Sequence, residues 1–233
     1  MILNSTNKIV VIIPAYNEQG SIGKVIRDIP KELISETVVC NNGSTDNTAS
    51  LAKNAGATVV SESKSGYGNA CLAGINYFKL QETKPDIVVF LDGDYSDYPH
   101  EMVNLTREIV EKEVDLVIGS RSTGQKEKGS MTPQQIFGNW LATNLMHLFY
   151  GVKFTDLGPF RAIKWDSLIA LNMQDKTYGW TIEMQLKAIK LKMKTSEISV
   201  NYRKRIGVSK VSGTIKGTVL AGYKIITAIF KYL

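Results

Sequence analysis

Cysteine, histidine and proline are scarce in this chain of 233 residues, which has two cysteines, two histidines and six prolines. The thiols of Cys40 and Cys71 are too few for a disulfide framework, and Cys40 lies in an apolar run, where a small buried thiol is expected. The sequence therefore indicates a protein of a reducing compartment. Neither His100 nor His147 has a metal-ligating neighbour at helical spacing, so we expect structural roles for both.

Long apolar runs are also absent. No stretch of about 18 uninterrupted apolar residues occurs, and the first eight residues, MILNSTNK, lack the charged and apolar regions of a secretory signal. We therefore expect a cytoplasmic protein, for which peripheral attachment to the inner face of the membrane stays open. With 43% hydrophobic and 21% charged residues, the composition is typical of a globular protein, and we expect one domain over 1–233.

Acidic residues are scarce in the second half. Residues 1–120 carry 10 Lys and Arg against 16 Asp and Glu, whereas residues 121–233 carry 18 against 6, so the net charges are −6 and +12. A basic surface indicates a partner such as nucleic acid, anionic lipid or a phosphate group. We expect no nucleic acid, because no helix-turn-helix, zinc-ligand or aromatic RNA-binding pattern accompanies the charge.

Short β-rich runs alternate with helical patterns up to residue 120. We predict strands near 8–14, 36–41, 57–61, 86–91 and 115–119, and helices near 20–29, 46–55, 68–82 and 99–112. This alternation predicts an α/β fold with parallel βαβ units, right-handed crossovers and helices flanking the sheet. After a polar loop at 121–130, which we expect to be mobile, the sequence predicts helices near 133–150 and 180–192, a strand near 196–203 and a helix near 213–232.

The most informative run is 87–91, which is apolar without interruption and ends in Asp92 and Asp94. Such a run predicts a strand covered on both faces, and open α/β sheets bind ligands beyond the carboxyl ends of their strands. Side chains two apart on a strand point the same way, so both carboxylates can face one Mg²⁺ or Mn²⁺ that also holds a diphosphate. A solvated acidic turn is the alternative. An EF-hand is a poor match, because Asp97 stands where its glycine is required.

Five further motifs accompany the two aspartates, in order along the chain. They are PAYNE at 14–18, NNGSTD at 41–46, GSR at 119–121, TDLGPFR at 155–161 and RKRIGVSK at 203–210. Together with DGD at 92–94 they resemble glycosyltransferase family 2, which has the GT-A fold, a Rossmann-like arrangement. The resemblance covers roughly residues 8–212. Within the family, the motifs look most like those of the branch that includes dolichol-phosphate mannose synthase and bacterial polyprenyl-phosphate glycosyltransferases.

This resemblance implies a metal-dependent, inverting transfer of a hexose from a nucleoside diphosphate sugar to polyprenyl phosphate. The alternative is a family 2 enzyme that acts on a hydroxyl of a soluble sugar or small molecule. A sugar nucleotidyltransferase is disfavoured, because the chain lacks the Gly-rich, Arg-containing N-terminal loop of that class. A degenerate nucleotide-binding scaffold is disfavoured by Asp92 and Asp94.

The nucleotide-sugar half is expected over 1–120. The resemblance implies that Pro14, Tyr16 and Glu18 wall the nucleoside pocket and that Asn42 meets the base edge. The family often has Asp-Asp or Asp-Asn where this chain has two asparagines, and an amide both accepts and donates, so the base stays open. Gly66 lies in a turn that opens a helix and is interpreted as part of the same wall, because backbone amides there could approach the donor.

Positive charge is needed to stabilise the leaving nucleoside diphosphate. We expect it from Arg121, which directly follows the fifth predicted strand, and from Arg205 and Lys210 in the basic loop that resembles the diphosphate-side loop of the family. The spacing makes Arg203 an alternative to Arg205, and a solvated loop arginine is the alternative for Arg121.

Two carboxylates remain as candidates in the acceptor half, 121–212. Asp156 matches the aspartate that lies near the transferred sugar in the family. A phosphate acceptor is already ionised near neutral pH, so Asp156 would then only orient the acceptor or the sugar. Glu183 would act as a general base if the acceptor were a hydroxyl, and a carboxylate on a helix surface is the alternative.

The final segment, 213–233, is predicted to be an amphipathic helix. At about 100° per residue, Lys216, Lys224 and Lys231 fall within roughly 80° of one another, and the rest of the circumference is mostly apolar. This pattern fits a helix on an anionic membrane surface. Packing on the core or on a second chain of a homo-oligomer is the alternative. Trp140, in the predicted helix 133–150, belongs to a second apolar surface.

Overall fold

The computed structural model describes residues 7–207 and 215–233. Within these residues seven strands form one sheet in the order β3-β2-β1-β4-β6-β5-β7. The strands are β1 (Ile9–Ala15), β2 (Glu36–Asn41), β3 (Thr58–Ser61), β4 (Ile87–Phe90), β5 (Leu116–Ser120), β6 (Arg161–Lys164) and β7 (Thr195–Ser199). Only β6 runs antiparallel to its neighbours, β4 and β5. The predicted α/β class with a mostly parallel sheet is therefore confirmed.

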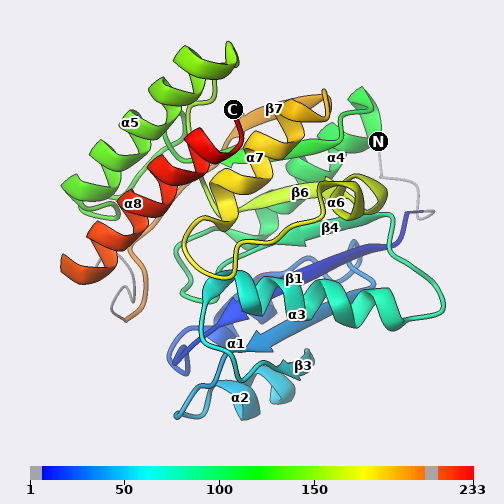
Figure 1. Ribbon diagram of the computed structural model, residues 1–233. Coiled ribbons are helices and arrows are strands. Elements are labelled where there is room, and N and C mark those ends of the chain that lie inside the picture. The colour runs from blue at the N-terminus through cyan, green and yellow to red at the C-terminus, as the bar shows by residue number, and fades with distance from the viewer. Residues whose placement is uncertain (1–6, 208–214) are drawn as a thin grey trace.

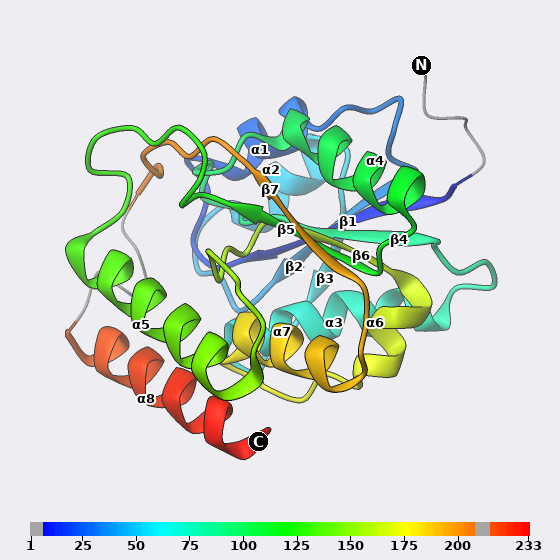
Figure 2. The same cartoon turned by 90° about the horizontal axis from the view of Figure 1, so that it is seen from above.

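Helices cover both faces of the sheet (Figures 1 and 2). One face carries α1 (Ile22–Asp28), α2 (Thr48–Asn54) and α4 (Met102–Lys112), the last preceded by a 3-10 turn, η1 (Pro99–Glu101). The other face carries α3 (Tyr67–Leu80), α6 (Trp165–Leu171) and α7 (Trp180–Lys190). Two further helices, α5 (Pro133–Tyr150) and α8 (Ile215–Lys231), lie side by side beyond α7, at the outer border of this second layer (Figure 2).

The central strands are apolar because helices cover both of their faces. Every residue of β1, β4 and β5 is buried, as expected for parallel strands that lie between two helix layers. Gly74 lets α3 approach this sheet closely, because a Cβ there would lie 2.6 Å from the side chain of Ile12. Cys40 and Cys71 are buried free thiols, and burial raises the pKa of Cys40 to about 12. The expectation of a small buried thiol at Cys40 is confirmed.

The long helix α5 begins and ends where the sequence predicts. The Thr132 hydroxyl accepts from the Gln135 backbone N–H, and the Gln135 side chain accepts from the Thr132 N–H, which forms a capping box. Pro133 occupies the first turn, where its missing N–H leaves no bond unmade. Gly151 ends the helix with a φ of 70°, a left-handed conformation that glycine adopts without strain.

Strand β6 and helix α6 were not predicted from the sequence. Strand β6 has only four residues, and its direction has a consequence for the site. Because it is antiparallel, its first residue, Arg161, pairs with Phe90 near the end of β4 and with Ile118 in β5. The segment 155–160 before Arg161 is therefore brought to the carboxyl edge of the parallel strands.

The predicted strand 196–203 is too long, since β7 ends at Ser199. The residues that follow pair instead with the polar loop 121–130. The Tyr202 N–H donates to the Gln125 carbonyl at 2.9 Å, and the Glu127 N–H donates to the Tyr202 carbonyl at 2.9 Å. These bonds tie the polar loop to the segment that carries the basic motif and direct both to the same edge of the sheet.

Candidate active site

Side chains from four segments meet at the carboxyl edge of the sheet. Asp92 and Asp94 follow β4, Arg121 follows β5, Asp156 precedes the antiparallel β6, and Arg205 lies beyond the end of β7. The structure thus brings together five of the residues that the sequence singles out, although the segments are far apart along the chain.

The two aspartates of the DGD motif make different contacts. The Tyr67 hydroxyl donates to Asp92 Oδ1 at 2.9 Å, whereas Asp94 Oδ2 lies 2.8 Å from Arg205 Nη1. Asp94 Oδ1 accepts from the Ser96 backbone N–H at 2.9 Å. Asp94 is only 5% exposed, which a solvated acidic turn would not be.

Burial and the neighbouring Asp94 carboxylate raise the pKa of Asp92 to about 6. The pKa of Arg205 is also raised, but for a different reason. Its burial on its own would lower the pKa of the guanidinium, but the attraction of Asp94 raises it above its ordinary value. Two close carboxylates that repel one another form a site in which a bound cation is electrostatically favoured.

Asp97 is a third carboxylate beside this pair. It is 1% exposed, and neither of its oxygens has a hydrogen-bond partner. Burial, Asp92 and Asp94 together raise the pKa of Asp97 well above its ordinary value. The sequence offered Asp97 only as a mismatch to an EF-hand, and its burial beside Asp92 and Asp94 is visible only in the structure.

Hard oxygen ligands of this kind fit Mg²⁺ or Mn²⁺, which bind through one or two carboxylates and complete their shell with water and substrate phosphate oxygens. Within residues 7–207 and 215–233 no group of three or more His, Cys, Asp or Glu side chains is arranged to enclose a metal. Asp92 and Asp94 therefore fit an open metal site that shares its cation with a ligand, rather than a closed structural cage.

Arg121 and Asp156 form a closed pair next to the two aspartates. The guanidinium donates to both carboxylate oxygens, from Nε at 2.9 Å and from Nη2 at 2.7 Å, and the Arg121 backbone N–H donates to Oδ2 at 2.7 Å. Burial on its own would raise the pKa of Asp156, but Arg121 lowers it below its ordinary value. The guanidinium also lies over the ring of Tyr202, 5.1 Å from its centroid. The alternative of a solvated loop arginine does not fit this geometry.

The two basic-loop candidates differ in what they contact. Arg205 pairs with Asp94, whereas the Arg203 guanidinium lies 3.3 Å from the ring centroid of Tyr95 and donates to the Tyr95 carbonyl at 2.6 Å. Of the two, Arg205 is thus the one on the DGD carboxylates. Lys210, the other basic residue singled out, lies outside the described residues.

The loops after β1 and β2 form one connected wall. Pro14 is buried at the end of β1, and Tyr16, two residues later, is 44% exposed. The Asn17 N–H donates to the Ser44 hydroxyl at 3.0 Å, and the Glu18 N–H donates to the Thr48 hydroxyl at 2.7 Å. The loop that carries the exposed Tyr16 ring is therefore held in place by the segment that follows β2.

Asn42 and Gly66 are linked directly. The Asn42 amide donates to the Glu62 and Lys64 carbonyls at 3.1 and 2.7 Å, and its oxygen accepts from the Gly66 N–H at 2.8 Å. Gly66 has a φ of 137°, and a Cβ there would lie 2.1 Å from the Lys176 carbonyl oxygen. The position thus requires glycine. In this structure the Asn42 side chain positions the turn before α3 rather than facing open space.

Glu183 lies at a different place. It is 1% exposed, and its carboxylate accepts from the Gln174 and Asp175 backbone N–H groups and from the Tyr232 hydroxyl, the last at 2.8 Å. Its Oε1 also lies 2.7 Å from Lys187 Nζ. It lines a pocket of about 470 Å³ between α7, α8 and the preceding loop. None of these described partners belongs to the DGD cluster.

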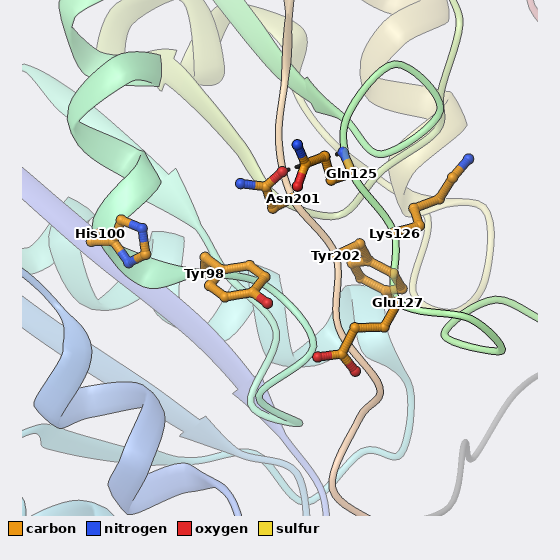
Figure 3. A pocket seen from close by; sticks show the side chains of 7 residues that line it. All are labelled: Tyr98, His100, Gln125, Lys126, Glu127, Asn201 and Tyr202. Carbon is orange, nitrogen blue, oxygen red and sulfur yellow. Dashed lines mark hydrogen bonds between the residues drawn. The ribbon is translucent and has the colours of Figure 1, made fainter.

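A second pocket, of about 310 Å³, opens next to Tyr202 (Figure 3). It is lined by Tyr98, His100, Gln125, Lys126, Glu127, Asn201 and Tyr202. The ring of His100 meets that of Tyr98 edge-on with 5.8 Å between centroids. His100 is exposed, and its structural role stays a prediction.

Comparison with known proteins gives a consistent result. Residues 10–171 match the family model described as Glycosyl transferase family 2. An uncharacterized glycosyltransferase of Mycobacterium tuberculosis is 31% identical over 91% of this chain and 94% of its own length. A dolichyl-phosphate hexose transferase of Haloferax volcanii is 28% identical over 90% of this chain and 89% of its own.

Among solved structures, glucosyl-3-phosphoglycerate synthase from Mycobacterium tuberculosis, crystallised with Mn²⁺, UDP and glucosyl-3-phosphoglycerate, has a similar fold. The TM-score is 0.75 at 22% identity, and the match covers 97% of this chain and 80% of that one. This likeness confirms the predicted GT-A fold.

Proposed function

We propose that this chain, which belongs to glycosyl transferase family 2 and is therefore a glycosyltransferase, transfers a hexose from a nucleoside diphosphate sugar to polyprenyl phosphate. The observation that carries the proposal is the meeting of Asp92 and Asp94 with Arg205 at the carboxyl edge of the sheet. The relative that is named a dolichyl-phosphate hexose transferase supports the acceptor class. The structural neighbour crystallised with Mn²⁺ and UDP supports the donor class and the cation.

The donor would lie in the half formed by 1–120. Tyr16 and the backbone around Gly66 would flank the nucleoside, with Pro14, Glu18 and Asn42 holding these loops in position. Asp92 and Asp94 would hold Mg²⁺ or Mn²⁺, which when bound would neutralise charge on the diphosphate. The tyrosine hydroxyl of Tyr67 would orient Asp92.

The acceptor half, 121–212, would supply the remaining groups. A phosphate oxygen of the acceptor would attack the anomeric carbon as the bond from that carbon to the diphosphate oxygen breaks, and the electron pair would leave on the nucleoside diphosphate. One such displacement inverts the anomeric configuration. Arg205 would stabilise the charge that develops on the leaving group, and the sequence makes Lys210, which is outside the described residues, a second candidate for this role.

Asp156 would be a positioning residue. Both of its oxygens are engaged by Arg121, and its pKa is low, so it is a poor proton acceptor. An ionised phosphate needs no general base. Asp156 would thus hold the Arg121 guanidinium, whose charge it compensates, in place at the edge of the site.

A second candidate function is transfer to a hydroxyl of a soluble acceptor. It is favoured by the polar pocket that Glu183 lines, because the same pocket also carries Lys176, Lys224 and Lys231. In that case Glu183 would act as the base.

The test combines donor binding with transfer. Thermal shift with Mn²⁺ against a panel of UDP- and GDP-hexoses should identify the donor, and transfer of its labelled hexose to a short, water-soluble prenyl phosphate should follow. Asp94→Asn should lower turnover at least about 10²-fold with the melting temperature little changed. Asp166→Asn, a change of an exposed aspartate, is the matched control.

Full activity of Asp94→Asn, or of the wild type in excess chelator, would contradict the metal assignment. Transfer to a soluble sugar but to no prenyl phosphate would favour the second candidate function.

A further inference from the structure

Exposed apolar side chains are concentrated on two helices. Of the 15 large hydrophobic residues that are exposed in the described part of the chain, 10 lie on α5, on α8 or at the C-terminal residue after α8. They are Ile136, Phe137, Trp140, Leu148, Phe149, Leu220, Tyr223, Ile226, Phe230 and Leu233. We call this set the two-helix apolar face. Monomeric soluble proteins rarely expose so many large apolar groups together unless the surface binds something.

The two helices form one continuous surface. They lie side by side at the outside of the molecule (Figures 1 and 2). The rings of Phe149 and Phe230, both exposed, meet edge-on with 5.4 Å between centroids. The Tyr150 hydroxyl donates to the Ile229 carbonyl at 2.6 Å, which fastens the last turns of α5 and α8 together.

The charges on these helices are of one sign. Neither α5 nor α8 contains an aspartate or a glutamate, whereas α8 contains Lys216, Lys224 and Lys231. Lys224 lies 3.7 Å from Asp175, and the Lys231 ammonium lies 5.0 Å from the ring centroid of Tyr232. These two lysines line the pocket beside α7, so they border the apolar face rather than interrupt it. The side chain of Lys216 lies outside the described residues.

We propose that the two-helix apolar face inserts into the head-group layer of an anionic membrane. An apolar face that is bordered by lysines, on two helices without Asp or Glu, complements a surface of negative lipid head groups over hydrocarbon. Trp140 and Tyr223 combine an apolar ring with a polar tip, as side chains at membrane interfaces commonly do. Within the described residues no helix is long and apolar enough to cross a bilayer.

A second copy of the chain would complement the face less well. In a two-fold contact the same patch meets itself, so lysines would approach lysines without a carboxylate from either helix to pair them. A bilayer supplies the missing negative charge and has no fixed shape to match. A bilayer also holds the tail of a polyprenyl phosphate. The purpose of the membrane contact, which is access to this acceptor, therefore rests on the proposed function.

Trp140 provides a direct measurement on the unaltered protein. It is 57% exposed, whereas the two other tryptophans of the chain, Trp165 and Trp180, are 7% and 1% exposed. Vesicles of phosphatidylcholine and phosphatidylglycerol that carry brominated acyl chains should quench its fluorescence, and Trp140→Phe, which keeps an apolar ring, should remove most of the quenching but not the binding.

Flotation with the same vesicles tests the apolar contact by substitution. Phe137→Gln combined with Trp140→Gln should weaken binding about 10-fold or more, because each change removes a large apolar group from the inserted face. The matched control is Leu80→Gln combined with Leu191→Gln, which changes two exposed leucines, one at the end of α3 and one directly after α7, and should bind as the wild type does. Binding should also weaken as salt rises and as phosphatidylglycerol is left out.

Three outcomes would overturn the inference: no quenching of the wild type, equal flotation of the Phe137 and Trp140 double variant, or a wild-type dimer that the same variant converts to a monomer. The last would assign the face to a second copy. Transfer to a short prenyl phosphate in solution is scored separately. If that transfer occurs without vesicle binding, only the membrane inference fails; vesicle binding without transfer to any prenyl phosphate refutes only the proposed acceptor.

Discussion

Two arginine–carboxylate pairs lie at the same edge of the sheet, and they are built differently. Arg121 and Asp156 are joined by two side-chain hydrogen bonds and one backbone hydrogen bond, and the side chains are 10% and 0% exposed. Arg205 and Asp94 share one contact of 2.8 Å, and the Arg205 side chain is 23% exposed. In the first pair both carboxylate oxygens of Asp156 are engaged by Arg121. In the second pair Arg205 is partly exposed and can move away from Asp94 towards solvent.

This difference indicates a structural role for the Arg121–Asp156 pair and a role in substrate binding for the Arg205–Asp94 pair. A closed, buried pair fixes the ends of segments that come from distant parts of the chain, and breaking it leaves an uncompensated charge. A half-open pair between a carboxylate and an arginine suits a site where a cation and a diphosphate would compete for the two charges. Both arginines belong to the basic half, residues 121–233. Arg121 pairs with a carboxylate of the same half, whereas Arg205 pairs with Asp94 of the acidic half, residues 1–120.

The largest effect is expected from Asp156→Asn. The change leaves the buried Arg121 guanidinium without its counterion and should lower the free energy of unfolding by about 3–5 kcal/mol. Urea denaturation at pH 7 measures it, with Asp166→Asn on the surface as the control, for which we expect a change within about 0.5 kcal/mol. A loss below about 1 kcal/mol would mean that the closed pair does not hold the edge together.

The same pair predicts an acid dependence. Arg121 lowers the pKa of Asp156 below the ordinary 3.8, so the unfolded chain takes up the proton at a higher pH than the folded chain does. The stability that the pair contributes is therefore complete above the unfolded value of 3.8 and is lost as the pH falls below it. In urea titrations from pH 6 downward, the difference between wild type and Asp156→Asn should shrink below about pH 4. A constant difference would contradict the assignment.

A smaller effect, on rate rather than stability, is expected from Arg205→Gln. If Arg205 stabilises the leaving diphosphate, kcat should fall about 10²-fold while the melting temperature changes little. Arg107→Gln, at an exposed arginine of α4, is the control and should keep wild-type kcat. An effect confined to KM would mean that Arg205 binds the ground state and transition state equally.

The parts of the fold that the sequence predicts correctly are those in which local pattern and environment agree. Strands β1, β4 and β5 are buried apolar runs, and β2 has a buried apolar centre, so the bounds of all four differ from the prediction by at most one residue. The positions of Asp92, Asp94 and Arg121 follow directly, because each of these residues comes just after such a strand.

The rest depends on contacts that a linear pattern does not contain. Strand β6 is four residues long, and nothing in Arg161–Lys164 states that it runs antiparallel, yet that direction brings Asp156 to Arg121. Likewise, the amide of Asn42 serves a turn 24 residues later, at Gly66. Tyr67 and Asp97 were overlooked because their importance depends on what lies next to them in space.

The smallest effect is expected at Glu183, which lies outside both pairs. Its carboxylate is engaged by two backbone N–H groups, Tyr232 and Lys187, so it has little capacity left to take a proton from an acceptor. The glutamine of Glu183→Gln keeps one oxygen that accepts hydrogen bonds, but its NH₂ group would face the N–H and O–H groups that now donate to the carboxylate. We expect a stability loss of about 1–3 kcal/mol, together with a fall in kcat of less than about 10-fold for a prenyl phosphate acceptor.

The measurement is single-turnover transfer at a temperature where the variant is folded, with Glu111→Gln, a change of an exposed carboxylate on α4, as the control. A general base contributes typically about 10²–10⁴-fold to the rate, so a loss in that range would contradict the expectation. If the loss also disappeared at high pH, where a hydroxyl acceptor ionises more readily, Glu183 would be the base, and the half-open pair would belong to an enzyme with a soluble acceptor.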